Sequence, residues 1–291
     1  MQKTLHTLSV TLLYAAMTAL ASAAEFTAKD LATEEGKFAA YSVKNGMRGA
    51  FLEYFAEQSW LLRPEPVDAK AWLRARPDPA IVLDWKSQRT ILSASGDLGY
   101  STGPWILRSK ADANAAAGHG QFFSLWQKQQ NGEWKVFIDH GISHGPTATP
   151  DALPIAPLIA LDLVSQHALA NKANDDAEQQ FISLGSAAYG IVVTPNTRLL
   201  RDGQFPIDGP AAIGQYLKSQ EGQWSWTVKL RGASRANDLA YAVGNFTFHP
   251  KEGVGSKGQY VRVWMRESSG ALPSRWTLAA EVLTPEPPPK T

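Results

Sequence analysis

The stretch SASGDLGYSTGPW, residues 93–105, has a second, imperfect copy later in the chain, RANDLAYAVGNF, residues 235–246. Each begins with turn residues and continues with a run of apolar residues, as in a β-hairpin. The matching residues lie 141 positions apart: Asp97 and Asp238, Leu98 and Leu239, Tyr100 and Tyr241, and Gly103 and Gly244. The next segment repeats 138 to 142 positions later, through Gly120 and Gly258, Gln121 and Gln259, Trp126 and Trp264, Gly132 and Gly270, Trp134 and Trp276, and Asp139 and Glu281. One strand-rich fold has therefore been used twice.

The N-terminus has the pattern of a targeting segment. Lys3 supplies a positive charge, residues 8–20 are apolar, and Ala21-Ser22-Ala23 is a small-residue cleavage site. The apolar stretch is shorter than the ~20 residues that a membrane span needs, which favours a cleaved signal peptide over a retained anchor. We expect a signal peptide over residues 1–23 and a bacterial protein that is periplasmic or secreted.

The composition restricts both the partners and the source of stability. The chain has 291 residues, 44% of them hydrophobic, with ten tryptophans, no cysteine and a net charge of +1. Disulfides and thiol chemistry are excluded, so stability must come from burial. Near-zero charge without a basic cluster argues against nucleic acid or an anionic membrane surface as a partner. We expect a monomer whose two halves pair internally.

Helices precede strands in each copy, which predicts an α+β fold with helices on one face of a curved antiparallel sheet. Helical spacing covers residues 33–55, with a break near Asn45-Gly46, and also residues 67–74 and 158–188. Strands are predicted over residues 81–85, 90–95, 98–107, 121–129 and 134–142. The expected domains are residues 24–146 and 168–284, joined by a Pro-rich linker and helix start over 147–167 and followed by a Pro-rich tail over 285–291.

The strand predicted at residues 121–129 carries large apolar groups on both faces. Phe122 and Trp126 alternate with Phe123 and Leu125. A sheet with one face in water should alternate apolar with polar residues instead. We therefore expect the other copy to cover the second face, so that the chain forms an intramolecular pseudo-dimer.

These segments carry a family resemblance. Residues 93–105, together with GQFFSLW over residues 120–126 and GEWKVFID over residues 132–139, resemble the nuclear transport factor 2-like superfamily, in its bacterial branch known as a domain of unknown function. The resemblance covers nearly all of the first domain and is weaker in the second, whose entry is interrupted by Pro195. It implies two tandem cone-shaped domains of the ketosteroid isomerase and SnoaL-like type, each with a pocket between helices and sheet. Members include isomerases, cyclases, dehydratases and proteins without known activity, so the fold does not decide the function.

The isomerase chemistry of this family is not matched. The resemblance puts the catalytic base of ketosteroid isomerase at Arg63, and at Arg201 in the second copy. Arginine stays protonated and cannot act as a base. The position of the neutral acid falls near Ser124 and Arg262. Asp97 and Asp238 sit in turns, where a structural role suffices. Whether the protein is an enzyme stays open, with a binding function favoured.

An arginine among aromatic side chains suits a small, partly apolar organic anion. The predicted ligand-binding residues are Arg63, Trp60, Trp85, Tyr100, Trp126 and Asp139, with second-copy equivalents Arg201, Tyr241, Trp264 and Glu281. The competing interpretation of Arg63 is a salt bridge to a carboxylate such as Asp139 or Glu53.

Two other functions stay open. One is a lyase, cyclase or isomerase in which Asp139 works with Tyr100 or Tyr41 as donor. The other is an interaction module whose pockets are filled by its own tryptophans. His140 and His144 do not complete a metal site with Asp139, because residues i and i+4 of a strand lie ~13 Å apart. We expect no metal and no cofactor.

Overall fold

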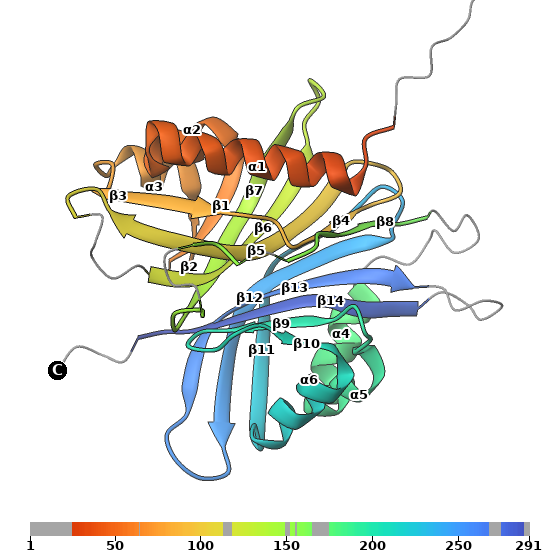
Figure 1. Ribbon diagram of the computed structural model, residues 1–291. Coiled ribbons are helices and arrows are strands. Elements are labelled where there is room, and N and C mark those ends of the chain that lie inside the picture. The colour runs from red at the N-terminus through yellow and green to blue at the C-terminus, as the bar shows by residue number, and fades with distance from the viewer. Residues whose placement is uncertain are drawn as a thin grey trace, which may run out of the picture.

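Two mixed β-sheets pack face to face, and each carries its helices on its outer side (Figure 1). The computed structural model describes residues 25–63, 65–112, 118–148, 152–154, 156–164, 175–267 and 275–287. The predicted α+β class, with helices before strands in each copy, is confirmed. The sheets are mixed rather than purely antiparallel, because β1 runs parallel to β7 and its counterpart β9 runs parallel to β14.

The first copy has the helices α1 (Ala28–Asn45), α2 (Met47–Tyr54) and α3 (Ala69–Arg74). Its strands are β1 (Phe55–Arg63), β2 (Glu65–Asp68), β3 (Ile81–Trp85), β4 (Arg89–Leu92), β5 (Leu98–Ser109), β6 (Gly118–Lys128) and β7 (Trp134–His144). With β8 (Ile159–Asp162) they form a sheet in the order β2-β1-β7-β6-β5-β4-β8, and β3 also pairs with β5.

The second copy has the helices α4 (Asp175–Leu184), α5 (Tyr189–Val192) and α6 (Gly209–Lys218), with a 3-10 turn at Gly185–Ala188. Its strands are β9 (Arg198–Arg201), β10 (Ile207–Asp208), β11 (Gly222–Ala233), β12 (Leu239–Pro250), β13 (Ser256–Glu267) and β14 (Arg275–Pro285). The strand order of this sheet is β10-β9-β14-β13-β12-β11. It repeats the order β2-β1-β7-β6-β5-β3 of the first copy, in which β3 pairs with β5.

The start and end of α1 follow from its terminal residues. Thr27 and Asp30 form a capping box: the Asp30 N–H donates to Thr27 Oγ1 at 3.3 Å, and the Thr27 N–H donates to Asp30 Oδ2 at 2.8 Å. Gly46 has φ of +88°, which disfavours a side chain, and it separates α1 from α2 at the predicted break.

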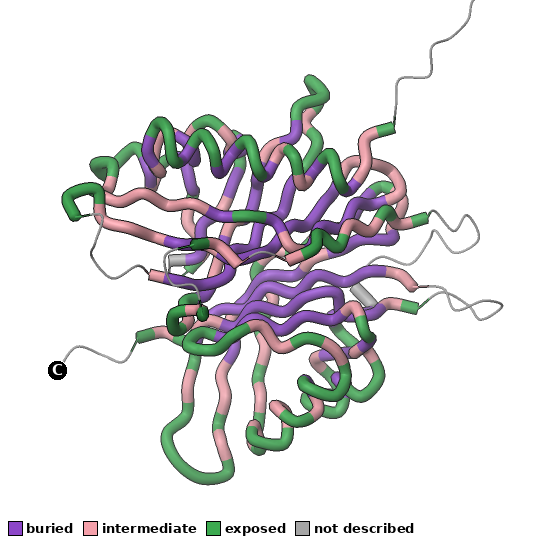
Figure 2. The backbone as a smooth tube through the Cα atoms, in the orientation of Figure 1, coloured by how far each residue is buried: buried purple, intermediate pink, exposed green. Residues whose placement is uncertain are grey.

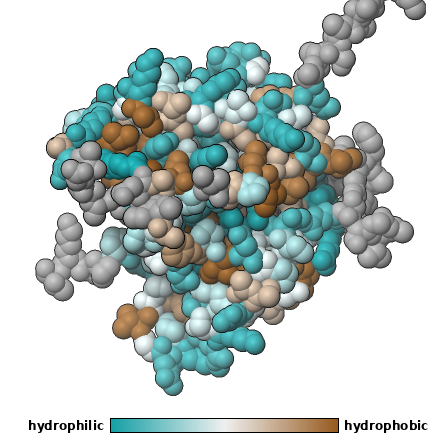
Figure 3. All heavy atoms as spheres, viewed as in Figure 1, coloured by the Kyte–Doolittle hydropathy of each residue, from teal (hydrophilic) through white to brown (hydrophobic). Residues whose placement is uncertain are grey.

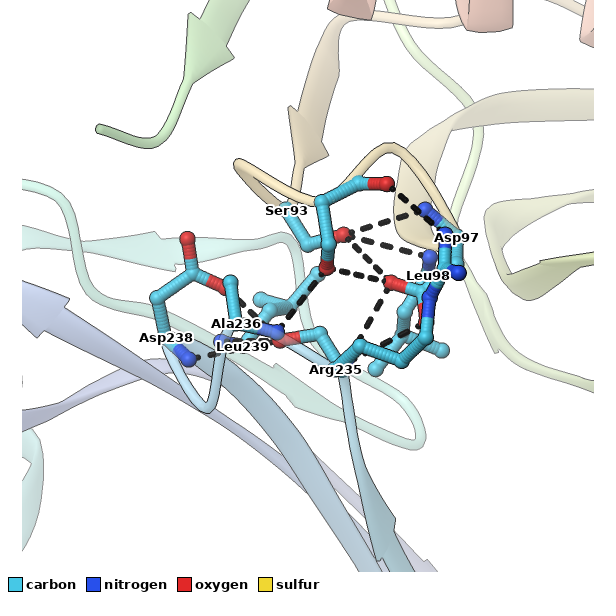
Figure 4. A network of polar contacts seen from close by, with 9 residues as sticks. Ser93, Asp97, Leu98, Arg235, Ala236, Asp238 and Leu239 are labelled. Carbon is cyan, nitrogen blue, oxygen red and sulfur yellow. Dashed lines mark hydrogen bonds and ion pairs between the residues drawn. The ribbon is translucent and has the colours of Figure 1, made fainter. Parts of the chain in front are cut away.

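The repeated turns of the two copies dock onto each other (Figure 4). Asp97 accepts the Arg235 N–H at 3.1 Å, and Asp238 accepts the N–H of Ala94, the counterpart of Arg235, at 2.8 Å. Positive φ falls on Gly96 and on its counterpart Asn237. The two aspartates therefore have the structural role expected of them, and each one joins the two copies.

An apolar core between the sheets confirms the pseudo-dimer. Phe123 and Leu125 point into it, whereas Phe122 and Trp126 point toward the helices of their own copy. Figure 2 shows the facing strands of the two sheets as a continuous buried layer. Further residues in this core are Leu98, Tyr100, Ile138, Leu239, Val243, Val261, Val263 and Val282.

The helical stretch predicted over residues 158–188 is wrong at its start, although α4 and the 3-10 turn that follows it do lie within this range. Residues 159–162 form the strand β8, which pairs in parallel with the otherwise open edge of β4, Ile91 opposite Leu161. Leu161 and Leu163 pack against the core between the sheets, so burial at that edge overrides the helical spacing of the sequence. Residues 165–174 lie outside the described part.

Residues 1–24 and 288–291 also lie outside the described part, and with them the predicted signal peptide and most of the tail. Among the residues that are described, no helix combines the length and the apolar character that crossing a bilayer requires.

Candidate functional site

A cavity of about 640 Å³ lies in the first copy, between α2 and α3 on one side and β3, β5 and β7 on the other. Its walls are mainly apolar and aromatic, and Asp139 adds a carboxylate from β7. Figure 3 shows hydrophobic residues gathered at the surface over this end of the first copy, where α3 and β3 lie. The apolar wall includes Phe51, Trp72, Leu83, Trp85, Trp105 and Phe122.

Two arginines border the cavity, but the protein itself engages both. Arg48 Nε donates to the carbonyl of Leu73 at 2.8 Å. Arg76 donates to the carbonyl of Trp72 at 3.0 Å and lies 4.0 Å above the indole of the same residue. Arg48 therefore ties α3 to α2, whereas the contacts of Arg76 stay within α3 and the loop after it.

A buried carboxyl group, Glu35 on α1, lies next to this wall. It is 0% exposed and accepts from two indoles, Trp85 Nε1 at 2.7 Å and Trp126 Nε1 at 2.7 Å. Burial raises the pKa of Glu35 to about 7, although the two indole donors oppose the rise. Trp85 therefore has two roles, since it lines the cavity and also holds Glu35.

The corresponding region of the second copy is filled by charged side chains. Arg262 is 0% exposed and donates to Glu178 Oε1 at 2.6 Å and to Glu281 Oε2 at 2.6 Å. Arg201 also donates to Glu281. Burial acts to raise the pKa of Glu281, but Arg262 and Arg201 hold it below its usual value. Beside Trp264 the space between helices and sheet is about 20 Å³. Another space of the second copy, about 500 Å³, lies along β11 next to Gln179 and Ile182 of α4.

Side-chain size on one strand pair explains part of this difference. In the first copy, Leu83 on β3 pairs with Leu107 on β5, and both line the cavity. Their counterparts are Trp224 and Phe248, which also pair and stack with ring centroids 4.2 Å apart. Two leucines in place of two stacked aromatic rings leave room at the cavity wall.

The structure brings together only part of the predicted site. Trp85 and Asp139 line the cavity, and Trp126 is buried behind it against Glu35. Asp139 also accepts from Ser124 Oγ at 3.3 Å. Arg63 ends β1 opposite Glu65, and its side chain lies outside the described part.

The prediction that Trp60, Tyr100 and Tyr41 share this pocket is wrong. Trp60 and Tyr100 face the core between the sheets, because strand residues alternate between the two faces. Tyr41 is 36% exposed on the outer side of α1, where it contacts Tyr54. Burial raises the pKa of Tyr100 to about 12, so its hydroxyl stays protonated near neutral pH.

The second-copy equivalents divide in the same way. Arg201, Trp264 and Glu281 belong to the buried polar cluster, in which Trp264 donates to Glu178 at 2.9 Å. Tyr241 instead lies in the core between the sheets, with its ring centroid 5.1 Å from that of Phe137.

Sequence reasoning missed Glu35 and Glu178. The signal was a Glu-x-x-Phe pattern on the first helix of each copy, at residues 35–38 and again at 178–181. It falls outside the strand repeat. No group of three or more histidine, aspartate or glutamate side chains within the described segments has an arrangement that could hold a metal ion.

No family model matches this sequence, and no curated protein matches it. Solved structures that resemble it include nuclear transport factor 2 from Cryptosporidium parvum, at 13% identity over 41% of this chain and 96% of that one, with a TM-score of 0.32. A ketosteroid isomerase-like protein from Erwinia carotovora has 16% identity over 42% of this chain and 96% of that one, with a TM-score of 0.31. A SnoaL-like protein from Jannaschia has 11% identity over 42% of this chain and 90% of that one, with a TM-score of 0.30.

Each of these structures covers about two fifths of this chain and at least 90% of its own length. Such low identities concern the fold alone. The chemistry of the site has to be argued from the residues of this chain.

Proposed function

We propose that this is an exported small-molecule-binding protein, with its site in the cavity of the first copy and a second copy that completes the paired core. One observation carries the proposal: the first copy has a cavity of about 640 Å³ where the second copy has a filled, charged core. A mainly apolar cavity of this size with one carboxylate suits a partly apolar organic molecule.

The alternative enzyme is less well supported by the geometry. Its acid, Asp139, lines the cavity, but neither of its proposed donors does, since Tyr100 faces the other sheet and Tyr41 lies on the outer side of α1. The interaction-module alternative fits the second copy, whose interior is occupied by its own side chains, better than it fits the first.

The binding proposal can be tested by giving the first copy the wall of the second. The double variant Leu83→Trp, Leu107→Phe should fill part of the cavity. We expect wild type to enhance the fluorescence of the neutral apolar probe N-phenylnaphthylamine, and the double variant to lose most of this enhancement.

A matched control adds an indole far from the cavity. Val254 is 95% exposed, so Val254→Trp should leave probe binding unchanged. Equal probe binding by wild type and the double variant, with both folded by circular dichroism, would contradict the proposal.

A further inference from the structure

Two buried arginines, one from each copy, meet at a single carboxylate. Arg89 on β4 is 5% exposed and Arg198 on β9 is 7% exposed. Arg198 donates to both carboxylate oxygens of Asp208 at 2.8 Å, whereas Arg89 Nη2 lies 3.7 Å from the nearer of them. Arg89 Nη1 donates to the carbonyl of Asn196 at 2.6 Å. The arginine of the first copy is therefore held by groups of the second.

Both arginines and the hydroxyl of Tyr100 face the layer between the two sheets. Tyr100 pairs with Ile91 on β4, and both residues belong to the core of this layer. Residues two apart on a strand share a face, so Arg89 lies on the same side as Ile91. Arg198 faces the layer from the other sheet, since Leu200 of the same strand also belongs to this core.

Each of the three side chains has a buried polar atom that makes no hydrogen bond within the described part of the chain. These atoms are Arg89 Nε, Arg198 Nη1 and the hydroxyl oxygen of Tyr100. A buried donor without an acceptor destabilises the folded state, more so when it belongs to a charged group. The three donors together call for an acceptor in the layer between the sheets.

The charge of this cluster is also unbalanced. Among the described residues, Asp208 is the only carboxylate that affects the pKa of either arginine. Burial and the neighbouring Arg198 lower the pKa of Arg89, against the opposing effects of Tyr100 and Asp208. Arginine nevertheless stays protonated, so two positive charges share one negative charge in a buried place. Buried charges are normally paired, which favours an additional anion here.

We infer that one chloride ion binds between the two copies and accepts hydrogen bonds from Arg89 Nε, Arg198 Nη1 and the Tyr100 hydroxyl. A monovalent anion supplies the missing negative charge and the missing acceptor together. A halide fits better than a carboxylate or a phosphate, whose further oxygen atoms would need donors of their own. The ion can enter past Asp208, whose side chain is 41% exposed.

This site lies on the opposite side of β5 from the cavity of the first copy, so the inference does not rest on the proposed binding function. The equivalent position at the other end of the layer is apolar. The counterparts are Leu230 for Arg89, Trp60 for Arg198 and Tyr241 for Tyr100. Tyr241 therefore serves as a matched control, a tyrosine in the same layer with no arginine at the corresponding positions.

The test is thermal unfolding of the full chain in mixtures of sodium chloride and sodium gluconate at constant total concentration. Constant ionic strength removes differences in screening, and gluconate is too large for the site. Above the dissociation constant of chloride, the Tm of wild type should rise by roughly 2 °C for each tenfold increase in chloride. Tyr100→Phe should need about tenfold more chloride for the same rise, because one donor to the anion is lost. Tyr241→Phe should respond as wild type does.

Bromide locates the ion directly. Crystals of wild type grown in sodium bromide should give an anomalous peak within hydrogen-bonding reach of Arg89 Nε, Arg198 Nη1 and the Tyr100 hydroxyl. A Tm that is the same in chloride and in gluconate would overturn the inference, and a bromide peak at the site would then mark an adventitious ion only. An equal response of Tyr100→Phe and wild type would overturn it as well, because chloride would then act elsewhere. The fluorescence titration with N-phenylnaphthylamine decides the proposed function independently.

Discussion

Replacing Glu35 by glutamine should change how the stability of this protein depends on pH. Glu35 is 0% exposed, and its pKa is raised from 4.5 to about 7, mainly by burial. The folded state therefore holds the proton more tightly than the unfolded chain does. The stabilisation from this group is complete below pH 4.5, decreases as the pH rises, and is lost above about pH 7.

The size of the effect follows from the shift in pKa. Each unit corresponds to about 1.4 kcal/mol, so the free energy of unfolding should lose about 2 to 3 kcal/mol between pH 5 and pH 8 through Glu35. Glutamine does not titrate. The free energy of unfolding of Glu35→Gln minus that of wild type should therefore rise by the same amount over this range, whatever its value at pH 5.

Urea denaturation of both proteins at half-unit pH steps measures this difference, and subtraction removes the contributions of all other groups. Glu34→Gln is the matched control, since Glu34 lies on the same helix, faces solvent and bridges Lys37 at 2.7 Å. An exposed pair of this kind contributes only a few tenths of a kcal/mol, so its difference should stay nearly flat. A flat difference for Glu35→Gln as well would refute the assignment of Glu35 as a buried acid that titrates near neutral pH.

Other substitutions test the pairing of the copies and the packing of the cavity. Asp238→Ala should lower the free energy of unfolding by about 1 to 3 kcal/mol, because the half-buried Ala94 N–H and the buried Ser234 hydroxyl both lose their acceptor. Asp97→Ala should cost less, since its partner Arg235 is exposed, and urea denaturation of the two variants compares them. Gly120→Ala should lower the free energy of unfolding in urea denaturation, because the new methyl group would collide with the backbone carbonyl of Ile142 on the paired strand β7 and with the Trp105 ring. Arg262→Met should destabilise the protein by about 3 to 5 kcal/mol, because two buried carboxylates lose a shared cation; a loss below about 1 kcal/mol in urea denaturation would contradict this.

The sequence by itself determined the features that depend on local chemistry and on alternation. Turn residues such as Gly96 and Asn237 and the break at Gly46 identified the turns and the end of α1. Apolar residues on both faces of β6 were enough to predict that the second copy covers the first, because only a sheet buried on both sides tolerates them.

Only the tertiary structure decided which residues share a site. Trp85 and Tyr100 looked equivalent as aromatic residues near an arginine, but they point to opposite sides of the sheet, and strand pairing decides which side faces the helices. Glu35 reaches Trp126 only through packing between residues 91 positions apart. The buried surroundings of Arg262 became visible only in the structure, because the aromatic rings and carboxylates around it come from four separate elements. Contacts between residues distant in the sequence created these surroundings, and no local pattern records them.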